Sequence, residues 1–541
     1  MRKLGAAMSV LVLSAAAAFG LAACGDSGKE GGMLKGSYAS FPDYLDPQLS
    51  YSAEGWTAMY NTYIPLLTYA HAGGEAGSEV VPGLAKSLPK ITNGGKTYTL
   101  TLRKGLRYSD GTAVKASDFK NAVERMFKLN SGGSFFYTDI AGAAEFEKTK
   151  TGGIDGIKPN DRTGEIVIDL VAPRGTFLNE LAMPFVAPVP ADTPDRDQSP
   201  NPPPATGPYA IVEANPGRGW SYARNPQWAK NNSKLMPDLP GGHVDRIEID
   251  VVRNQSTQVN DVEQGKSHWM FDPLPADRVA EVEGRYEGTQ YRPESTISTY
   301  FFWMNTTEPP FDDLEVRQAV NYAVDRDALV RIYSGQLDPG QQILPPGMPG
   351  HEEYELYPHD MAKAKALIAQ ADPADREITV WTDNLSPNDD AAAYYQDVLE
   401  RLGFDAKLKV LNGDNYFTVI GNLSTPDLDT GWANWFEDYP HPNDFLEPLL
   451  AGASIYPTNN TNLAQVDIPS LNERIDALRT QQLGAEQEEQ YAALDRAYME
   501  QAPWAPFGTR ELSTFVSSDI DLDKVIFNPT FSNDLTSFQF K

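Results

Sequence analysis

Residues 431–445 are the stretch of the sequence best suited to bind a charged small molecule. They read Gly-Trp-Ala-Asn-Trp-Phe-Glu-Asp-Tyr-Pro-His-Pro-Asn-Asp-Phe and combine aromatic rings, acids and two prolines. A helix does not tolerate Pro440 and Pro442, so a loop is predicted, leaving a possible strand over residues 428–432. Loops that leave strands in α/β proteins line ligand crevices, which makes Asp438 and its aromatic neighbours candidate binding residues.

The chemistry available to Asp438 is the binding of a cation. A carboxylate that is closed off from water costs several kcal/mol unless a positive group replaces the solvent. Two alternatives remain, because Asp438 can also be a solvated loop acid or the partner of a protein arginine. The rings of Trp432, Trp435 and Tyr439 either cover a ligand or belong to the core, and Glu437 is expected to face solvent.

The sequence shows no motif that assigns catalytic or metal-binding roles. There is no HExxH and no pair of cysteines, and Gly94-Gly95-Lys96-Thr97 lacks the upstream glycine of a phosphate loop. Gly25-Asp26-Ser27-Gly28 resembles a protease serine segment by chance, because no scaffold orients a histidine there. Of the six histidines only His441 lies near candidate residues, where it is either a metal ligand or a structural side chain. We therefore expect no enzyme activity, no cofactor and no metal.

Composition narrows the range of partners. The chain has 541 residues, with 74 Asp and Glu against 45 Lys and Arg, and a net charge of -29. This charge disfavours nucleic acids and anionic membrane surfaces as partners. The length allows a large core and more than one lobe, and the single cysteine excludes an internal disulfide.

Cys24 marks the end of an export signal. Arg2 and Lys3 precede an apolar run from residue 8 to residue 23 that is too short for a comfortable membrane span. Leu21-Ala22-Ala23-Cys24 resembles the lipobox of bacterial lipoproteins, which implies cleavage before Cys24 and lipidation of its thiol. We expect a signal peptide over residues 1–23, a flexible tether over residues 24–32, and a lipid anchor at the extracytoplasmic face of the cell membrane. The alternative is an ordinary signal peptide that happens to end near Cys24.

The body of the chain alternates strand and helix patterns. Strands are predicted over residues 97–102 and 244–252, where apolar residues alternate. Helical spacing predicts the buried face Phe119, Ala122, Val123, Met126 and Phe127. Further helices are expected over residues 313–333, 361–371 and 391–402, with Gly403 as a C-cap, and a helical pair over residues 470–500. Residues 514–541 have strand-like composition, and the eight prolines of residues 188–208 predict an irregular crossing between lobes.

Several motifs, in order along the chain, resemble the extracellular solute-binding proteins of family 5, the receptors of ABC importers for peptides and nickel. The matching segments are Val81-Pro82-Gly83-Leu84, Thr97-Tyr98-Thr99-Leu100-Thr101-Leu102-Arg103-Lys104-Gly105, Tyr108-Ser109-Asp110-Gly111, Thr206-Gly207-Pro208-Tyr209, Arg224-Asn225-Pro226-Gln227-Trp228, Val316-Arg317-Gln318-Ala319 and Asp325-Arg326. Gln227 departs from the Tyr or Asp that is usual in the family.

The resemblance implies an α/β fold of the type II periplasmic-binding-protein class, with two main lobes joined by a hinge and an extra lobe. Lobe I is expected over residues 33–58, 206–302 and 513–541, the inserted lobe II over residues 59–205, and lobe III over residues 303–512. It also implies capture of peptides between the lobes by hinged closure, and delivery to permease subunits that work with separate ATPase subunits.

The same resemblance assigns expected roles to individual residues. In the oligopeptide receptors the aspartate at the position of Asp438 pairs with the α-ammonium of the ligand, next to Tyr439. Relatives also use backbone groups after the Leu45-Asp46-Pro47 turn, which places Tyr51, Ser52, Ala53 and Glu54 on the cleft wall. One alternative keeps the fold but binds a sugar, an opine or a metal chelate, and a second is a secreted hydrolase.

Overall fold

The chain forms an α/β structure in which one large mixed sheet runs through two lobes. A computed structural model describes residues 29–541. Twelve strands form the sheet in the order β16-β15-β17-β13-β18-β11-β1-β10-β9-β8, with β12 and β14 added against β18. The bounds of these strands are β1 (Met33–Tyr38), β8 (Tyr209–Asn215), β9 (Gly219–Arg224), β10 (Arg246–Val251), β11 (Trp269–Met270), β12 (Tyr291–Ser295), β13 (Ser298–Met304), β14 (Leu337–Pro339), β15 (Glu377–Asp383), β16 (Asp405–Leu411), β17 (Thr430–Phe436) and β18 (Trp504–Val516).

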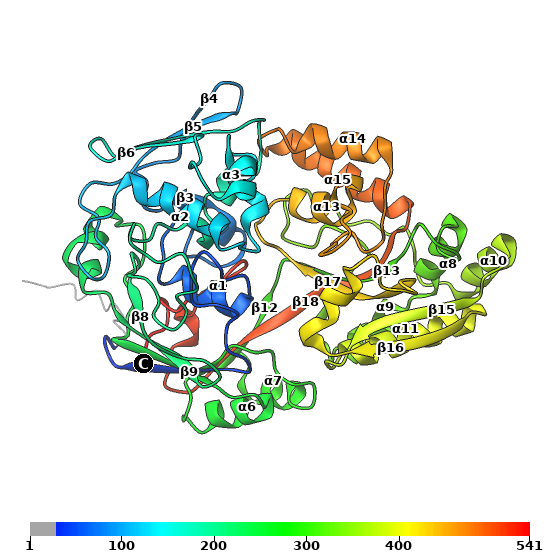
Figure 1. Cartoon of the computed structure of the whole chain (residues 1–541). Helices are drawn as coiled ribbons and strands as arrows, with labels where there is room; N and C mark the ends of the chain where they lie inside the picture. Colours follow the sequence, from blue (N-terminus) through cyan, green and yellow to red (C-terminus); the bar gives the residue numbers. More distant parts are fainter. Residues whose placement is uncertain (1–28) are drawn as a thin grey trace, which may run out of the picture.

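Strand β18 joins the two halves of the sheet and crosses between the lobes (Figure 1). Its first part pairs with β13 and β14, and its second part pairs with β11 and β12. The chain crosses a second time between β12 and β13, where the Thr296 hydroxyl donates to the Arg510 carbonyl at 2.6 Å. Two neighbouring extended segments therefore connect the lobes.

Lobe I is built on a core that includes Leu34, Trp220, Ile249 and Phe538. The helices α6 (Gln255–Glu263) and α7 (Val279–Tyr286) lie beside β11 and β12. Helix α1 (Ala53–Tyr60) packs between the lobe I and lobe II cores, and α5 (Ser233–Leu235) packs against the lobe II core through Leu235. After β18 only the short strands β19 (Phe527–Asn528) and β20 (Ser532–Asn533) form, so the strand-like composition of residues 514–541 overstates their regular structure. The Lys29 amide donates to the Phe540 carbonyl at 2.9 Å, so the start of the described chain lies beside the C-terminus.

Lobe II is an antiparallel sheet covered by helices. Its strands pair in the order β4-β5-β7-β6, and β2 pairs with β3 separately. The elements are β2 (Leu67–Tyr69), β3 (Val80–Pro82), β4 (Lys90–Thr92), β5 (Thr97–Thr101), β6 (Ile157–Asn160), β7 (Glu165–Asp169), α2 (Ala116–Lys128), α3 (Ala143–Thr149) and α4 (Phe177–Glu180). The face of α2 predicted from helical spacing is buried, with Phe119, Val123 and Met126 all fully shielded from solvent.

Lobe III contains the largest core, whose members lie between Ile297 and Phe507. Its helices are α8 (Leu314–Ala323), α9 (Arg326–Ile332), α10 (Met361–Ala371), α11 (Asn388–Leu402), α12 (Tyr416–Ile420), α13 (Asn443–Leu450), α14 (Pro469–Leu478) and α15 (Ala485–Glu500). The single helix predicted over residues 313–333 is wrong, because Val324 is extended and Asp325 caps a second helix by accepting the Ala328 amide at 3.2 Å. The C-cap at Gly403 is confirmed, with a φ of 97°.

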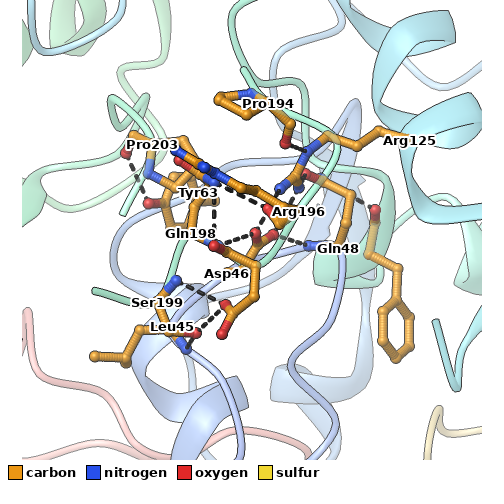
Figure 2. Close-up of polar contacts among 12 residues, drawn as sticks. Leu45, Asp46, Gln48, Tyr63, Arg125, Pro194, Arg196, Gln198, Ser199 and Pro203 are labelled. Carbon is orange, nitrogen blue, oxygen red and sulfur yellow. Dashed lines mark hydrogen bonds and ion pairs between the residues drawn. The ribbon is translucent and has the colours of Figure 1, made fainter. Parts of the chain in front are cut away.

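A buried ion pair holds the 45–48 turn against lobe II. Arg125 on α2 donates to both carboxylate oxygens of Asp46, the shorter bond being 2.6 Å, and to the Gln48 amide oxygen (Figure 2). It also donates to the carbonyls of Pro194 and Arg196, so the proline-rich segment wraps around the pair. This segment forms no helix or strand between residues 188 and 208, as predicted. The cluster fixes the turn that leads into Tyr51 and α1.

The helices of residues 29–541 do not include one whose length and apolar character suffice for crossing a membrane. Residues 1–28, which carry the expected signal peptide, Cys24 and most of the expected tether, lie outside the described residues.

Candidate functional site

The loop predicted to bind a ligand leaves β17 at the edge of lobe III that faces the other lobes. β17 extends to Phe436, beyond the strand predicted over residues 428–432, so Trp435 is a strand residue rather than a loop residue, whereas Trp432 lies in the strand as predicted. The loop covers residues 437–442 and leads into α13. Phe436 pairs with Ser298 at the start of β13, which places the loop next to the crossing between the lobes.

Three carboxylates gather at this loop. Asp438 accepts the Tyr51 hydroxyl through Oδ2 at 2.9 Å, and its own amide donates to Asp444 Oδ2 at 2.8 Å. Glu437, expected in solvent, is only 7% exposed. Its Oε1 accepts the Thr530 hydroxyl at 2.8 Å, and its buried Oε2 has no hydrogen-bond partner.

Burial dominates the electrostatics of these acids. It raises the pKa of Asp438 to about 7 and the pKa of Glu437 to about 8. The pKa of Asp444 lies well above its usual value because of burial and the nearby Asp438 charge. No lysine or arginine of residues 29–541 forms an ion pair with these three acids. Arg174, whose charge acts on Tyr439 and His441 of the same loop, pairs with Asp139 and Glu180 instead. The cluster therefore lacks the positive charge that would let its carboxylates ionise at little cost.

The loop is contacted from both of the other lobes. Tyr51 packs beside the lobe II core, and Thr530 belongs to the C-terminal segment. Tyr439 is 2% exposed and packs among lobe II residues, with its ring centroid 6.0 Å from that of Phe136. A second contact between lobes II and III is the bond from the Gly175 amide to the Arg479 carbonyl at 2.8 Å. Residues distant in sequence thus close around the carboxylates.

The remaining candidates occupy varied places. Trp432 is 2% exposed and donates to the Tyr333 hydroxyl at 3.0 Å, within the lobe III core. Trp435 is half-buried, and its indole N–H points to Asp444 Oδ2 at 3.4 Å. Ser52 caps α1 by accepting the Gly55 amide at 3.2 Å.

Ala53 and Glu54 form the first turn of α1, so their backbone is helical rather than extended. The sequence pointed to the backbone after the turn, whereas the contact to Asp438 comes from the Tyr51 side chain.

His441 is buried in a neutral form. Its Nδ1 accepts the Asn443 amide at 3.1 Å, and burial lowers the pKa of the imidazole to about 3. Its Nε2 is buried without a hydrogen-bond partner. The residue lines a pocket of about 620 Å³ between lobes II and III, together with Glu79, Asn179, Pro440 and Gln482. Within residues 29–541, no group of three or more His, Cys, Asp and Glu side chains is arranged to hold a metal ion.

Sequence reasoning missed Glu437, Asp444 and Thr530. Asp444 carries a weak signal, because it lies six residues after Asp438 at the start of a helix that follows two prolines. Nothing near Thr530 in the sequence indicates that it contacts a residue 93 positions away.

Comparison with known proteins agrees with this architecture. The family model described as bacterial extracellular solute-binding proteins, family 5 Middle, matches residues 79–457. Heme-binding protein A of Haemophilus influenzae is 26% identical over 461 residues, covering 79% of this chain and 79% of that protein. The glutathione-binding protein GsiB of Escherichia coli is 24% identical over 444 residues, covering 80% of this chain and 81% of that protein.

A solved structure supports the same assignment. Clavulanic acid biosynthesis oligopeptide binding protein 2 superposes with a TM-score of 0.86 at 25% identity, covering 95% of this chain and 96% of that one. This chain therefore shares the fold of solved periplasmic binding proteins. With a family match over most of its length, the chain belongs to the bacterial extracellular solute-binding proteins, family 5.

Proposed function

We propose that the chain is the peptide receptor of an ABC importer and that Asp438 binds the α-ammonium group of the peptide. The observation that carries the proposal is the set of three carboxylates, the buried Glu437 and Asp444 and the half-buried Asp438, none of which forms an ion pair with a basic residue of the described chain. A peptide N-terminus supplies the missing cation. Asp438 Oδ2 accepts the Tyr51 hydroxyl, and the ammonium completes the shell of the same carboxylate.

Lobe closure gives the binding its selectivity. With lobe I over residues 33–58, 206–302 and 513–541, lobe II over residues 59–205, and lobe III over residues 303–512, the Asp438 loop closes against Tyr51 and Thr530. A ligand shifts such an equilibrium only through contacts that are stronger in the closed state. The peptide is released unaltered to the permease, and separate subunits hydrolyse ATP.

The other candidates divide between ligand contact and support. Tyr51, Asp438 and the half-buried Trp435 are the side chains we place against the peptide. Tyr439 and Trp432 anchor the loop and its strand, since both are 2% exposed. Ser52, Ala53 and Glu54 form the adjoining cleft wall.

The receptor is held at the membrane by lipid on Cys24, after removal of residues 1–23. Mass spectrometry of the membrane-bound protein tests this step, because a diacylglyceryl group adds two acyl chains to the mature N-terminus. A Cys24→Ser variant recovered from the membrane fraction in unchanged amount contradicts the anchor.

The ammonium contact is tested by calorimetry with a peptide and its N-acetylated form. Asp438→Asn is expected to weaken binding of the free-amine peptide by about 2–5 kcal/mol, and acetylation is expected to cost a similar amount. Asp397→Asn, a change at an exposed residue of α11, is the control and should bind normally. Unchanged affinity in both tests removes Asp438 from the proposal.

A thermal-shift panel separates peptides from other solutes. A true ligand raises the melting temperature by mass action. The panel contains peptides, glutathione, haem, sugars, opines and metal chelates. Glutathione also carries an α-ammonium, so stabilisation by glutathione keeps the role of Asp438, whereas stabilisation by a sugar alone overturns it. Cleaved peptides after incubation would indicate a hydrolase.

A further inference from the structure

The pocket of about 620 Å³ between lobes II and III is separate from the carboxylates of the Asp438 loop, none of which lines it. Lobe II contributes residues between 75 and 80 and between 175 and 179, and lobe III contributes Pro349, Pro440, His441 and residues 482–483. The volume lies within the range of about 300–1,000 Å³ that is usual for small-molecule sites. A molecule of suitable size in this pocket would touch both lobes.

His441 lines the pocket with an imidazole whose free nitrogen is a hydrogen-bond donor. Its Nδ1 accepts the Asn443 amide at 3.1 Å, so Nδ1 carries a lone pair and the single proton of the neutral ring lies on Nε2. Burial and the charge of Arg174 lower the pKa of the imidazole to about 3, which keeps the ring neutral. The Nε2–H group is buried and has no partner. A protonated Nε2 offers no lone pair to a metal ion, so the group requires a hydrogen-bond acceptor.

Lobe II places further polar groups along the same pocket. Ser78 ends the short helix η1 (Gly74–Ser78), and its Oγ is buried without a hydrogen-bond partner. Asn179 accepts the Tyr69 hydroxyl through Oδ1 at 3.0 Å, which leaves the NH₂ end of its amide to donate. Buried donors without acceptors are costly, so the two lobes together present groups that an oxygen-rich molecule would satisfy.

The charges around the pocket favour an uncharged ligand. Glu75 and Glu79 are the charged residues that line it, and both are exposed to solvent. No lysine or arginine of residues 29–541 lines the pocket, and Arg174, which acts on His441, is already paired with acids of lobe II. An anion would thus lose its water without gaining a counter-ion, and an ammonium group has no lone pair to offer to the Nε2–H of His441.

The rest of the lining is largely apolar. It includes Val80, Leu178, Pro349, Pro440 and Leu483. Apolar walls with a few converging polar groups are typical of small-molecule sites. Polyols and sugars match this lining, because their hydroxyl oxygens accept from N–H and O–H donors while their C–H surfaces pack against aliphatic side chains.

We propose that this pocket is a second binding site, which takes a small uncharged polyol or sugar whose oxygen atoms accept from His441 of lobe III and Ser78 of lobe II. The inference goes beyond the proposed peptide site and does not depend on it. The bound molecule joins the two lobes near the bond from the Gly175 amide to the Arg479 carbonyl, and so favours their contact. Ordered water is the other occupant that would satisfy these donors, and the test distinguishes the two.

The test measures thermal shift and calorimetric binding of the full-length protein with glucose, myo-inositol and trehalose, each at about 10 mM. Succinate and spermidine serve as the anionic and cationic probes. At least one neutral probe is expected to raise the melting temperature and to bind at one site, whereas neither charged probe should do so.

Ala76→Trp separates this pocket from every other place where a sugar acts. Ala76 is an exposed lining residue, so the indole should fill the pocket and abolish binding of the neutral probe. Ala366→Trp, at an exposed position of α10, is the matched control and should bind normally. The comparison also removes the general stabilisation that sugars give as excluded solutes, because both variants experience it equally.

Two smaller changes test the assigned donors one lobe at a time. His441→Asn keeps an oxygen acceptor for the Asn443 amide but removes the Nε2–H group. Ser78→Ala removes the unpartnered hydroxyl of lobe II. Each variant should bind the neutral probe about three- to tenfold more weakly, which corresponds to the loss of one hydrogen bond between uncharged groups.

Four results would overturn the inference. If no neutral probe binds the wild type, the pocket holds only water. If a probe binds Ala76→Trp as tightly as the wild type, it binds elsewhere. If succinate or spermidine binds in place of the neutral probes, the ligand class is wrong, and if His441→Asn and Ser78→Ala both bind normally, the assigned donors are wrong. The test of Asp438 uses peptides, so its failure is distinguishable from each of these.

Discussion

Peptide affinity should pass through a maximum at about pH 7 to 8. In the ligand-free arrangement in which Tyr51 contacts Asp438, burial raises the pKa of Asp438 to about 7, so below this pH the group is mainly a neutral carboxyl. An ammonium ligand binds the ionised form and must displace the proton. Affinity is therefore expected to fall about tenfold for each pH unit below the pKa. On the alkaline side the ligand loses its own charge, because an α-amino group has a pKa of about 7.7–8.0.

The sign of the effect follows from the direction of the shift. A carboxyl whose pKa is raised in the folded protein binds a proton at pH 6 that its unfolded form would have lost, and ammonium binding releases that proton. Calorimetry in buffers of different ionisation enthalpy should thus show close to one proton released per peptide at about pH 6, and fewer at about pH 8.

Tyr51→Phe locates the titrating group. The hydrogen bond from the Tyr51 hydroxyl lowers the pKa of Asp438, so its loss should move the acidic limb of the profile to higher pH. Asp397→Asn, on the exposed surface of α11, should leave the profile unchanged. An affinity that stays constant between about pH 5.5 and pH 7 in the wild type would refute the reasoning, because no shielded carboxyl would then control binding.

Two further predictions concern the contacts between lobes. Gly175→Ala should weaken ligand binding and enlarge the molecule in small-angle scattering, because an added Cβ would lie 1.7 Å from the Gln481 carbonyl oxygen where lobe II meets lobe III. Gly284→Ala, with open space around it, is the control. Equal scattering curves for the two variants would contradict a role of Gly175 in the contact between lobes II and III. Arg125→Met should destabilise the protein by about 3–5 kcal/mol in thermal or urea unfolding, because it leaves Asp46 charged and buried. Lys128→Met removes an exposed ion pair with Asp195 and should lower the free energy of unfolding by about 0–1 kcal/mol. Equal losses of stability in both variants would show that burial of the Arg125–Asp46 pair does not increase its contribution to stability.

Local sequence patterns predicted the helices and strands whose apolar spacing and capping residues are close together in the sequence. Helix α10 has the predicted bounds, since its apolar spacing and its capping Asp360 are contiguous in sequence. The break between α8 and α9 was missed because Val320, Ala323 and Val324 continue the helical spacing up to it. The competing signal is Asp325, whose carboxylate begins a new helix by accepting the Ala328 amide.

The site could be predicted only where one residue carries its own chemistry. Asp438 stood out from its loop, but nothing local distinguishes it from Glu437, and the more deeply buried acid is the one expected in solvent. Burial of Glu437 depends on Thr530, which is brought there by the C-terminal segment. Arg510 looks like an ordinary strand residue until the pairing of β12, β13 and β14 around β18 places it at the crossing. Strand pairing between residues so far apart in the chain cannot be predicted from a short segment of the sequence.

The same contacts explain how charge can control closure. Under the proposed lobe closure, Tyr51 and Thr530 would reach the Asp438 loop as the lobes meet, and this meeting would shield Glu437 and Asp438 from water. Closure therefore gains two hydrogen bonds but raises the pKa of Glu437 to about 8 and the pKa of Asp438 to about 7. At neutral pH the closed protein must either bind protons at these carboxyls or keep them ionised in a poorly solvated site. A ligand cation removes that cost at the moment when the lobes touch. Its binding energy thus appears mainly in the closed state, which is the condition for a permease to distinguish a loaded receptor from an empty one.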